Sequence, residues 1–199
     1  PYLLKKHRSG ARLGHDTTYD HMFLDGLEDA YEEGRAMGTF AQETANDYQM
    51  TREEMDEYSI ESLRRANAAI DSGAFADEVV PVRFTTRKGE VTVEHDEQPG
   101  KGRPDKIPQL RPAFAKDGTI TAATSSSISD GAAAVVMSRE SVAKANGQQP
   151  VAKIVAMAAH AQEPAQFTVA PIGAIEKVLD KAGWSADEVE LWEVNEAFA

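Results

Sequence analysis

The pattern that most restricts the fold lies in the last quarter of the chain. Residues 151–159 form an apolar run that predicts a buried strand, and residues 171–182 have the apolar spacing of an amphipathic helix that ends at Gly183. Residues 189–194 then form a second strand-like run. A strand, a helix and a strand in this order predict two parallel strands joined by the helix that covers them. The expected fold class is therefore α/β.

The chain before residue 128 has a different character, and we expect an α+β part there. Apolar residues at helical spacing predict a first helix over residues 22–31. Capping boxes at residues 39–42 and 51–54 predict the starts of two further helices, the second of which ends at Gly73. These signals predict an α-rich stretch.

Strands and turns are expected after this helical stretch. Alternating apolar residues at 80–84 and 91–93 flank a turn and predict a β-hairpin. Residues 96–112 are rich in proline, glycine and charge, which predicts a long loop. The polar residues 129–131 can cap a buried helix that begins at Ala132.

Composition excludes several classes of protein. The 199 residues include no cysteine, which excludes disulfides and thiolate metal sites within them. No apolar run approaches the ~20 residues that span a bilayer, and no secretory signal is visible, so we expect a cytoplasmic protein. The net charge of −12 disfavours nucleic acid and anionic membranes as partners. Pro1 is not an initiator and the chain stops after a strand-like run, so we expect a partial sequence.

A basic segment near the N-terminus contrasts with this acidic balance. The first 15 residues hold four cations and no acid: Lys5, Lys6, Arg8 and Arg12. Such a segment is either a solvated loop or a place that attracts a small anion.

Ordinary catalytic motifs are missing. There is no glycine-rich phosphate loop, no Gly-x-Ser-x-Gly elbow and no metal-ligand spacing, and the five histidines lie in different predicted elements. Three segments stand out instead. They are Met37-Gly38-Thr39 at a helix start, the hydroxyl-rich residues 124–134, and Asn195-Glu196-Ala197-Phe198-Ala199 after a strand, where α/β proteins place their sites.

These three segments resemble the thiolase family in the same order. The Thr-Arg-Glu-Glu-x-Asp helix start at residues 51–56, the Val-Val-Pro-Val run at 79–82 and Leu-Arg-Pro-Ala-Phe at 110–114 extend the resemblance over essentially all 199 residues. The resemblance implies a thiolase loop domain over 1–128, the end of the N-terminal core half over 129–150, and the start of the C-terminal core half over 151–199. The implied fold is an α+β loop domain followed by part of a layered α/β core.

The resemblance also implies an activity. Thiolases make or break a carbon–carbon bond between acyl-CoA units, using a cysteine nucleophile, a second cysteine and a histidine for proton transfer. In the family the two cysteines lie before and after the matching portion and the Gly-His-Pro histidine follows it, so we expect the chain by itself, which has no cysteine, to be inactive. The implied function is an acyl-CoA C-acyltransferase of fatty acid metabolism, with the acetyl-CoA C-acetyltransferase type preferred.

Partners and alternatives follow from the same resemblance. Coenzyme A enters as substrate and no other cofactor or metal is implied, and the whole protein is expected to be a homo-oligomer, a dimer or a tetramer. Ala36 stands where short-chain biosynthetic members often have histidine. A fatty-acid-degrading 3-ketoacyl-CoA thiolase and a non-catalytic acyl-CoA-binding module remain alternatives.

The resemblance assigns roles to residues that match its motifs. Asn195 would fix a water in an oxyanion site, and its alternative role is to cap a strand end. Four residues would line the acyl and pantetheine pocket, or else serve packing and capping alone: Met37, Ser126, Ala197 and Phe198. Three cations in the right loop would contact the adenine end of CoA: Lys101, Arg103 and Lys106. The basic N-terminal segment falls at the tetramerisation loop and would steer CoA phosphates.

Overall fold

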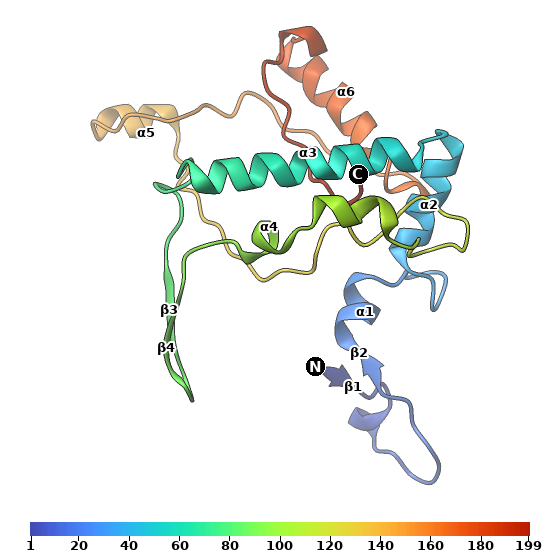
Figure 1. The fold of residues 1–199 in the computed structure, drawn as a ribbon. Helices are drawn as coiled ribbons and strands as arrows, with labels where there is room; N and C mark the ends of the chain where they lie inside the picture. The colour runs from blue at the N-terminus through green and yellow to red at the C-terminus, as the bar shows by residue number, and fades with distance from the viewer. The chain divides into compact units, whose positions relative to one another are not determined.

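The computed structural model describes residues 1–199, which separate into two units (Figure 1). The first unit contains Pro1–Ser126 together with Glu196–Ala199, and the second contains Ser127–Asn195. The last four residues therefore return to the first unit although the 69 residues before them do not.

Helices dominate the first unit. Its elements in chain order are β1 (Tyr2–Leu3), the 3-10 helix η1 (His7–Ser9), β2 (Tyr19–Asp20), α1 (His21–Gly26), α2 (Met37–Asp47), α3 (Arg52–Asp71), β3 (Val82–Thr86), β4 (Gly89–Val93), α4 (Glu97–Lys101) and the 3-10 helix η2 (Pro104–Gln109). The second unit contains α5 (Glu140–Ala145), η3 (Pro164–Gln166), α6 (Ala170–Ala182) and η4 (Ala186–Glu188).

Helix α3 begins where its local sequence predicts. The Thr51 hydroxyl accepts from the backbone N–H of Glu54, and the Glu54 carboxylate accepts from the backbone N–H of Thr51 at 2.9 Å. This reciprocal pair satisfies two backbone donors that a helix start leaves free, so the predicted capping box is confirmed. The helix ends at Asp71, two residues before the predicted Gly73.

Helix α2 begins two residues earlier than predicted and has no side-chain cap. The predicted capping box at Thr39 and Gln42 is wrong because both side chains have other partners. Thr39 donates its hydroxyl to the carbonyl of Ala36 at 2.8 Å. Gln42 points away from the helix start and is buried against residues 119–120.

The Gln42 carboxamide joins α2 to a distant loop. Its Oε1 accepts from the backbone N–H groups of Thr119 at 2.9 Å and Ile120 at 3.1 Å. Its Nε2 donates to Thr119 Oγ1 and to Asn46 Oδ1, both at 3.1 Å. Only 4% of Gln42 is exposed, so water cannot reach its carboxamide and these bonds satisfy its polar atoms instead. Residues 119–124 are thereby held against α2.

The apolar core of the first unit lies between α2, α3 and this loop. Ala41, Ala45, Met55 and Ile120 form its buried cluster. Three residues pack against the cluster from outside: Phe114, Phe198 and Ala199. The C-terminal tetrapeptide is therefore part of the packing of this unit.

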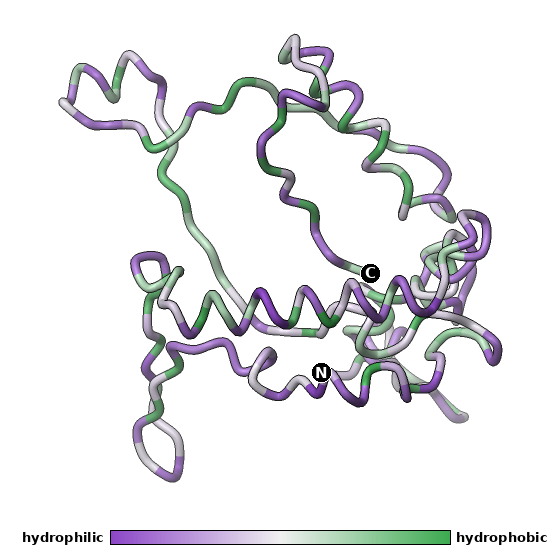
Figure 2. Tube along the Cα trace, turned by 45° about the horizontal axis from the view of Figure 1, so that its top comes forward, coloured by the Kyte–Doolittle hydropathy of each residue, from purple (hydrophilic) through white to green (hydrophobic).

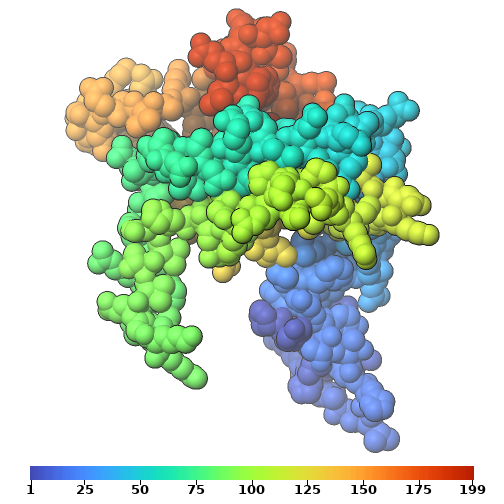
Figure 3. Space-filling model, viewed as in Figure 1, coloured from blue at the N-terminus to red at the C-terminus, as the bar shows by residue number.

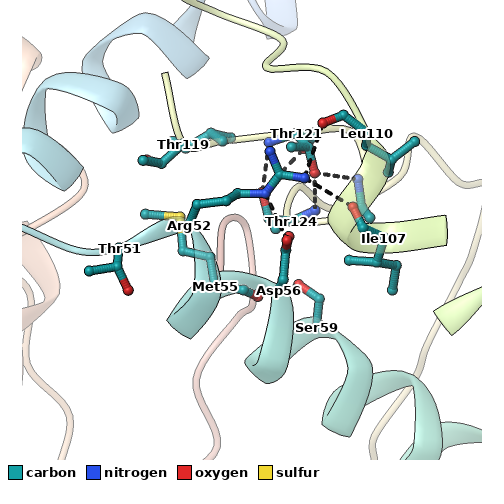
Figure 4. Close-up of polar contacts among 12 residues, drawn as sticks. Thr51, Arg52, Met55, Asp56, Ser59, Ile107, Leu110, Thr119, Thr121 and Thr124 are labelled. Atoms are coloured by element: carbon teal, nitrogen blue, oxygen red, sulfur yellow. Dashed lines mark hydrogen bonds and ion pairs between the residues drawn. The ribbon is translucent and has the colours of Figure 1, made fainter. Parts of the chain in front are cut away.

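A polar network closes the other side of α3 (Figure 4). Arg52 pairs with the buried Asp56 at 2.8 Å and donates to the carbonyls of Ile107 and Leu110, both at 3.0 Å. A second set of bonds joins Thr121 and Thr124, whose hydroxyls accept from each other's backbone N–H groups. The Arg52 bonds attach η2 and Leu110 to the first turn of α3, and the threonine bonds brace the loop at 121–124 internally.

The predicted hairpin is confirmed as β3 and β4. The strands are antiparallel, with Val82 opposite Val93 and Phe84 opposite Val91. Figure 3 shows the hairpin as a narrow projecting arm, and its apolar side chains are exposed. The predicted loop over residues 96–112 is in part wrong, because it contains α4 and η2.

The first predicted helix is also shorter than its apolar spacing suggests. Helix α1 spans six residues and its cap is Asp20, which accepts from the N–H of Met22 at 2.9 Å. Tyr31, expected on the buried face, lies beyond the helix and is exposed. Alongside it, β1 and β2 form a two-residue antiparallel ladder that encloses the basic segment.

Helix α6 of the second unit matches its prediction. It has Pro171 in its first turn and ends at Gly183, whose φ of 70° lies in the left-handed region that favours glycine. Lys177 and Lys181, one turn apart, donate to the carbonyls of Ala159 and Met157. These bonds hold the segment at 157–160 beside α6.

Three other predictions in the second unit are wrong. No helix begins at Ala132, and residues 151–159 and 189–194 form no strand in the described chain. The trace of the second unit has long stretches without helix or strand, and parts of them are hydrophobic (Figure 2). Val136 and Val151 are fully exposed. A strand needs a neighbouring strand for its backbone hydrogen bonds, and residues 1–199 supply none to these runs.

None of the helices has the length and apolar character needed to cross a membrane.

Replacing Gln42 by leucine should destabilise the first unit. The change leaves the N–H groups of Thr119 and Ile120 without acceptors in a buried site, at a cost of about 2–4 kcal/mol for the pair. Urea unfolding followed by circular dichroism measures this. The matched control is Gln149→Leu, an exposed glutamine in the second unit. Equal midpoints for the two variants would show that Gln42 does not hold the loop.

The capping box predicts a pH dependence. Hydrogen bonds from the backbone and hydroxyl of Thr51 lower the pKa of Glu54 below its usual value of 4.5. Since the folded-state pKa is depressed, the stabilisation is complete above about pH 4.5 and is lost as pH falls through the folded-state pKa.

Urea midpoints measured from pH 7 to pH 3 test this. Glu54→Gln should flatten the acid limb of the curve, whereas Glu57→Gln, on an exposed face of the same helix, should leave the limb unchanged. Identical acid limbs of the stability curve in Glu54→Gln and Glu57→Gln would contradict the assignment of this pH dependence to the capping box.

Candidate functional site

The last residues of the chain pair with the hydroxyl-rich segment. The N–H of Ser126 donates to the carbonyl of Ala197 at 2.9 Å, and the N–H of Ala199 donates to the carbonyl of Thr124 at 2.8 Å. Between these bonds Ser125 faces Phe198 in an antiparallel bridge. Two of the segments singled out in the sequence, more than 60 residues apart, are therefore joined by an isolated antiparallel bridge in the structure.

The third segment joins them through an aromatic pair. The ring of Phe198 meets the ring of Phe114 edge to face, with centroids 6.1 Å apart. Phe114 in turn covers Gly38 so closely that a Cβ atom there would overlap its ring. The glycine after Met37 is thus required by packing. The structure brings Met37, Ser126, Ala197 and Phe198 into one unit, with Met37 half-buried at the start of α2.

Glu196 is held by helix α3. Its Oε1 accepts from the hydroxyl of Tyr58 at 2.8 Å, and its Oε2 accepts from the hydroxyl of Ser62 at 2.7 Å. Their spacing within the helix predicts that both hydroxyl residues belong to its buried stripe, but Tyr58 is 48% exposed in the structure. Their i, i+4 spacing is the signal that could have marked them as a pair on one face.

Asn195 is exposed and is the last residue of the second unit. It is joined by a peptide bond to Glu196, the first residue of the tetrapeptide that belongs to the first unit. Its role as a water-holding amide therefore rests on its place in the motif.

The three cations expected to meet the adenine end of CoA lie on α4 and at η2. All three are exposed. Lys101 pairs with Glu97 at 3.3 Å and Lys106 pairs with Asp105 at 3.9 Å, while Arg103 precedes η2. These acidic neighbours offset part of the positive charge. Exposed pairs of this kind are weak, so both lysines can exchange them for a phosphate.

The basic N-terminal segment lies in and after the β1 strand. Lys5 sits 4.1 Å from the ring centroid of Tyr19 and 3.8 Å from Glu33. Arg8 lies in η1, and Lys6 and Arg12 are exposed. The segment thus presents its charges at the surface.

The shifted pKa values in the chain have structural causes. Arg64 and Arg65 hydrogen-bond to Glu61 on the exposed face of α3 and lower its pKa to about 2. The lowered pKa values of Glu54 and Glu188 come from helix caps, and Glu32 and Glu43 raise that of Arg35. None marks an acid or base at the C-terminal segment. No group of three or more histidine, aspartate and glutamate side chains is placed to hold a metal ion.

This arrangement joins the motif segments by backbone pairing and aromatic packing but supplies no thiol. Within the first unit, the small and aromatic residues Ala197 and Phe198 lie beside the hydroxyl-rich segment that contains Thr124 and Ser126. The 199 residues contain no cysteine to attack a thioester.

Comparisons with known proteins agree with this geometry. The family model described as the thiolase N-terminal domain matches residues 1–141, and the thiolase C-terminal domain matches residues 148–199. The acetyl-CoA acetyltransferase of Rhizobium meliloti (strain 1021) is 46% identical over 193 residues, covering 96% of this chain and 49% of that protein.

Solved structures show the same α/β fold. The acetyl-CoA acetyltransferase of Bacillus anthracis superposes with a TM-score of 0.93 at 40% identity, and human mitochondrial 3-ketoacyl-CoA thiolase superposes with 0.90 at 35% identity. Each comparison covers 100% of this chain and 50% of the other, so the chain spans about half the length of the proteins it matches. With family models that together cover nearly every residue and a fold that agrees with them, this chain belongs to the thiolase family.

Proposed function

We propose that the protein to which these residues belong is an acyl-CoA C-acyltransferase that condenses acyl-CoA units or cleaves 3-ketoacyl-CoA. The observation that carries the proposal is the pairing of Ala197 and Ala199 with Ser126 and Thr124, which joins two of the family's motif segments. The acetyl-CoA acetyltransferase type is preferred because relatives over the whole chain bear that name.

Each residue that matches the family's motifs has a proposed task. The Asn195 amide holds a water that donates to the thioester oxygen as negative charge develops on it. Met37, Ala197 and Phe198 enclose the acyl group, and Ser126 contacts the pantetheine arm. Lys101, Arg103 and Lys106 bind the nucleotide end of CoA. The attacking thiol and the proton-transferring groups come from parts of the protein outside these 199 residues, and CoA is the substrate, with no further cofactor.

Two alternatives have support in specific observations. The likeness to human mitochondrial 3-ketoacyl-CoA thiolase favours a fatty-acid-degrading enzyme with a longer acyl substrate. The absence of cysteine favours a non-catalytic acyl-CoA-binding module. Rates with acetoacetyl-CoA and with a long-chain 3-ketoacyl-CoA, measured on the full-length protein, separate all three. Activity on the short substrate supports our preference, preference for the long one supports the degrading enzyme, and no turnover of either supports the module.

The proposal extends to the domain organisation, assembly and cellular location of the enzyme. The residues 1–128 form the loop domain, and the remaining residues belong to the two halves of the core. The exposed basic segment around Lys5 and Arg8 serves the assembly of a homotetramer and attracts CoA phosphates. The enzyme acts in fatty acid metabolism in the cytoplasm and has no nucleic-acid or membrane partner.

The 199-residue chain by itself should not cleave acetoacetyl-CoA. Thioester formation needs a thiolate, and no cysteine is present to provide one. The loss of the enolate absorbance of acetoacetyl-CoA in the presence of free CoA measures the reaction. Turnover above the background rate by the purified chain would overturn the assignment of the nucleophile.

Asn195→Ala in the full-length protein should reduce turnover about 100-fold, because one oxyanion-site donor contributes about that factor. The comparison variant is Asn146→Ala, which removes an exposed amide at the end of α5 and should retain full activity. Steady-state kinetics of both variants decide the point. Wild-type turnover in Asn195→Ala would show that the Asn195 amide has no role in the oxyanion site.

A further inference from the structure

We propose that Tyr58 and Ser62 are positioning residues that orient the Asn195 amide through Glu196. The two side chains lie one turn apart on α3 and each donates its hydroxyl to a different oxygen of the same carboxylate, at 2.8 Å and 2.7 Å. This inference rests on the proposed function, because it concerns how the amide assigned to the oxyanion site is aimed.

The hydroxyls of Tyr58 and Ser62 and the carboxylate of Glu196 form a clamp whose two donors keep a fixed separation, because both belong to one long helix, although both bonds are exposed to solvent. Helix α3 spans 20 residues and is anchored at its start by the Thr51 capping box and by the Arg52–Asp56 pair. Two donors at fixed separation define both the place of the Glu196 carboxylate and its rotation. A single donor would leave the carboxylate free to turn about one hydrogen bond.

Glu196 is the residue directly after Asn195, so a constraint on Glu196 acts on the peptide bond that joins the two. The backbone pairing of the C-terminal segment begins with the carbonyl of Ala197, one residue after Glu196. The residue joined directly to Asn195 is therefore held by its side chain, while the residues after it are held by their backbones. If the clamp is lost, the peptide between Asn195 and Glu196 is restrained only by the backbone pairing that begins at Ala197.

The charge of the carboxylate gives the clamp a second effect. An oxyanion site must keep negative charge away from the oxygen on which charge develops. The hydroxyls of Tyr58 and Ser62 draw both carboxylate oxygens toward α3. Deleting either hydroxyl would leave one oxygen of the Glu196 carboxylate without its donor, so its negative charge would be less closely held to α3.

Kinetics of hydroxyl-deletion variants in the full-length protein test the proposal. Misplacement of one catalytic group by about 1 Å can cost about 100-fold in rate. Since each variant removes only one of the two donors, Tyr58→Phe and Ser62→Ala should each lower kcat about tenfold, with KM for acyl-CoA within about twofold of wild type. Ser62→Thr, which retains the hydroxyl, should recover most of the rate. Unchanged kcat in both deletion variants would overturn the proposal.

Matched controls use hydroxyls that do not reach Glu196. Ser59 lies on the same helix but donates to the carbonyl of Met55, and Tyr48 is an exposed tyrosine after α2. Ser59→Ala and Tyr48→Phe should keep wild-type kcat. Thermal unfolding midpoints confirm that all four deletion variants are folded, and a kcat loss that follows lowered midpoints would assign the clamp to stability and overturn the proposal.

Combination with Asn195→Ala separates the two proposals. If Tyr58 acts through the amide, adding Tyr58→Phe to Asn195→Ala should cause little further loss, since the group it positions is already gone. Losses that multiply would show that Tyr58 acts independently of Asn195 and would overturn the positioning role while the function stands. Wild-type turnover in Asn195→Ala alone would overturn the proposed function itself.

Discussion

The buried carboxamide of Gln42 is the constraint on which the first unit depends. It satisfies two backbone N–H groups of the loop at 119–120, and that loop leads into Thr124, which accepts from the last residue of the chain. Without this attachment the loop would have unpaired backbone donors in an apolar core, at a cost that is a large part of the stability of a small domain. The candidate site therefore rests on one side chain that touches no part of it.

The same loop explains why glycine and aromatic residues occur where they do. Gly118 lies so close to the Gln42 carboxamide that a side chain there would overlap it, and Gly38 gives room to the ring of Phe114. Phe114 then presents its edge to Phe198. A line of contacts runs from a glycine on α2 to the C-terminal motif, so the motif is supported by residues whose own chemistry is unremarkable.

Local signals predicted local structure well. The capping box at Thr51 and the left-handed Gly183 were readable because both act within a few residues of the helix end they define. The capping box expected at Thr39 failed because Gln42 bonds to residues 77 positions away. The expected strand over residues 151–159 failed for a related reason, since an apolar run becomes a strand only when a neighbour pairs with it.

The sequence by itself determined which segments resemble the family's motifs, the hairpin, the start of α3 and the end of α6, because these depend on residue identity and short-range bonding. The tertiary structure alone decided that Glu196 meets Tyr58 across 138 positions of chain and that Ser126 faces Ala197. No local pattern encodes such pairs. They form because α2, α3 and the loop at 119–124 share one apolar core, and burial of that core places the polar groups around it within hydrogen-bonding distance.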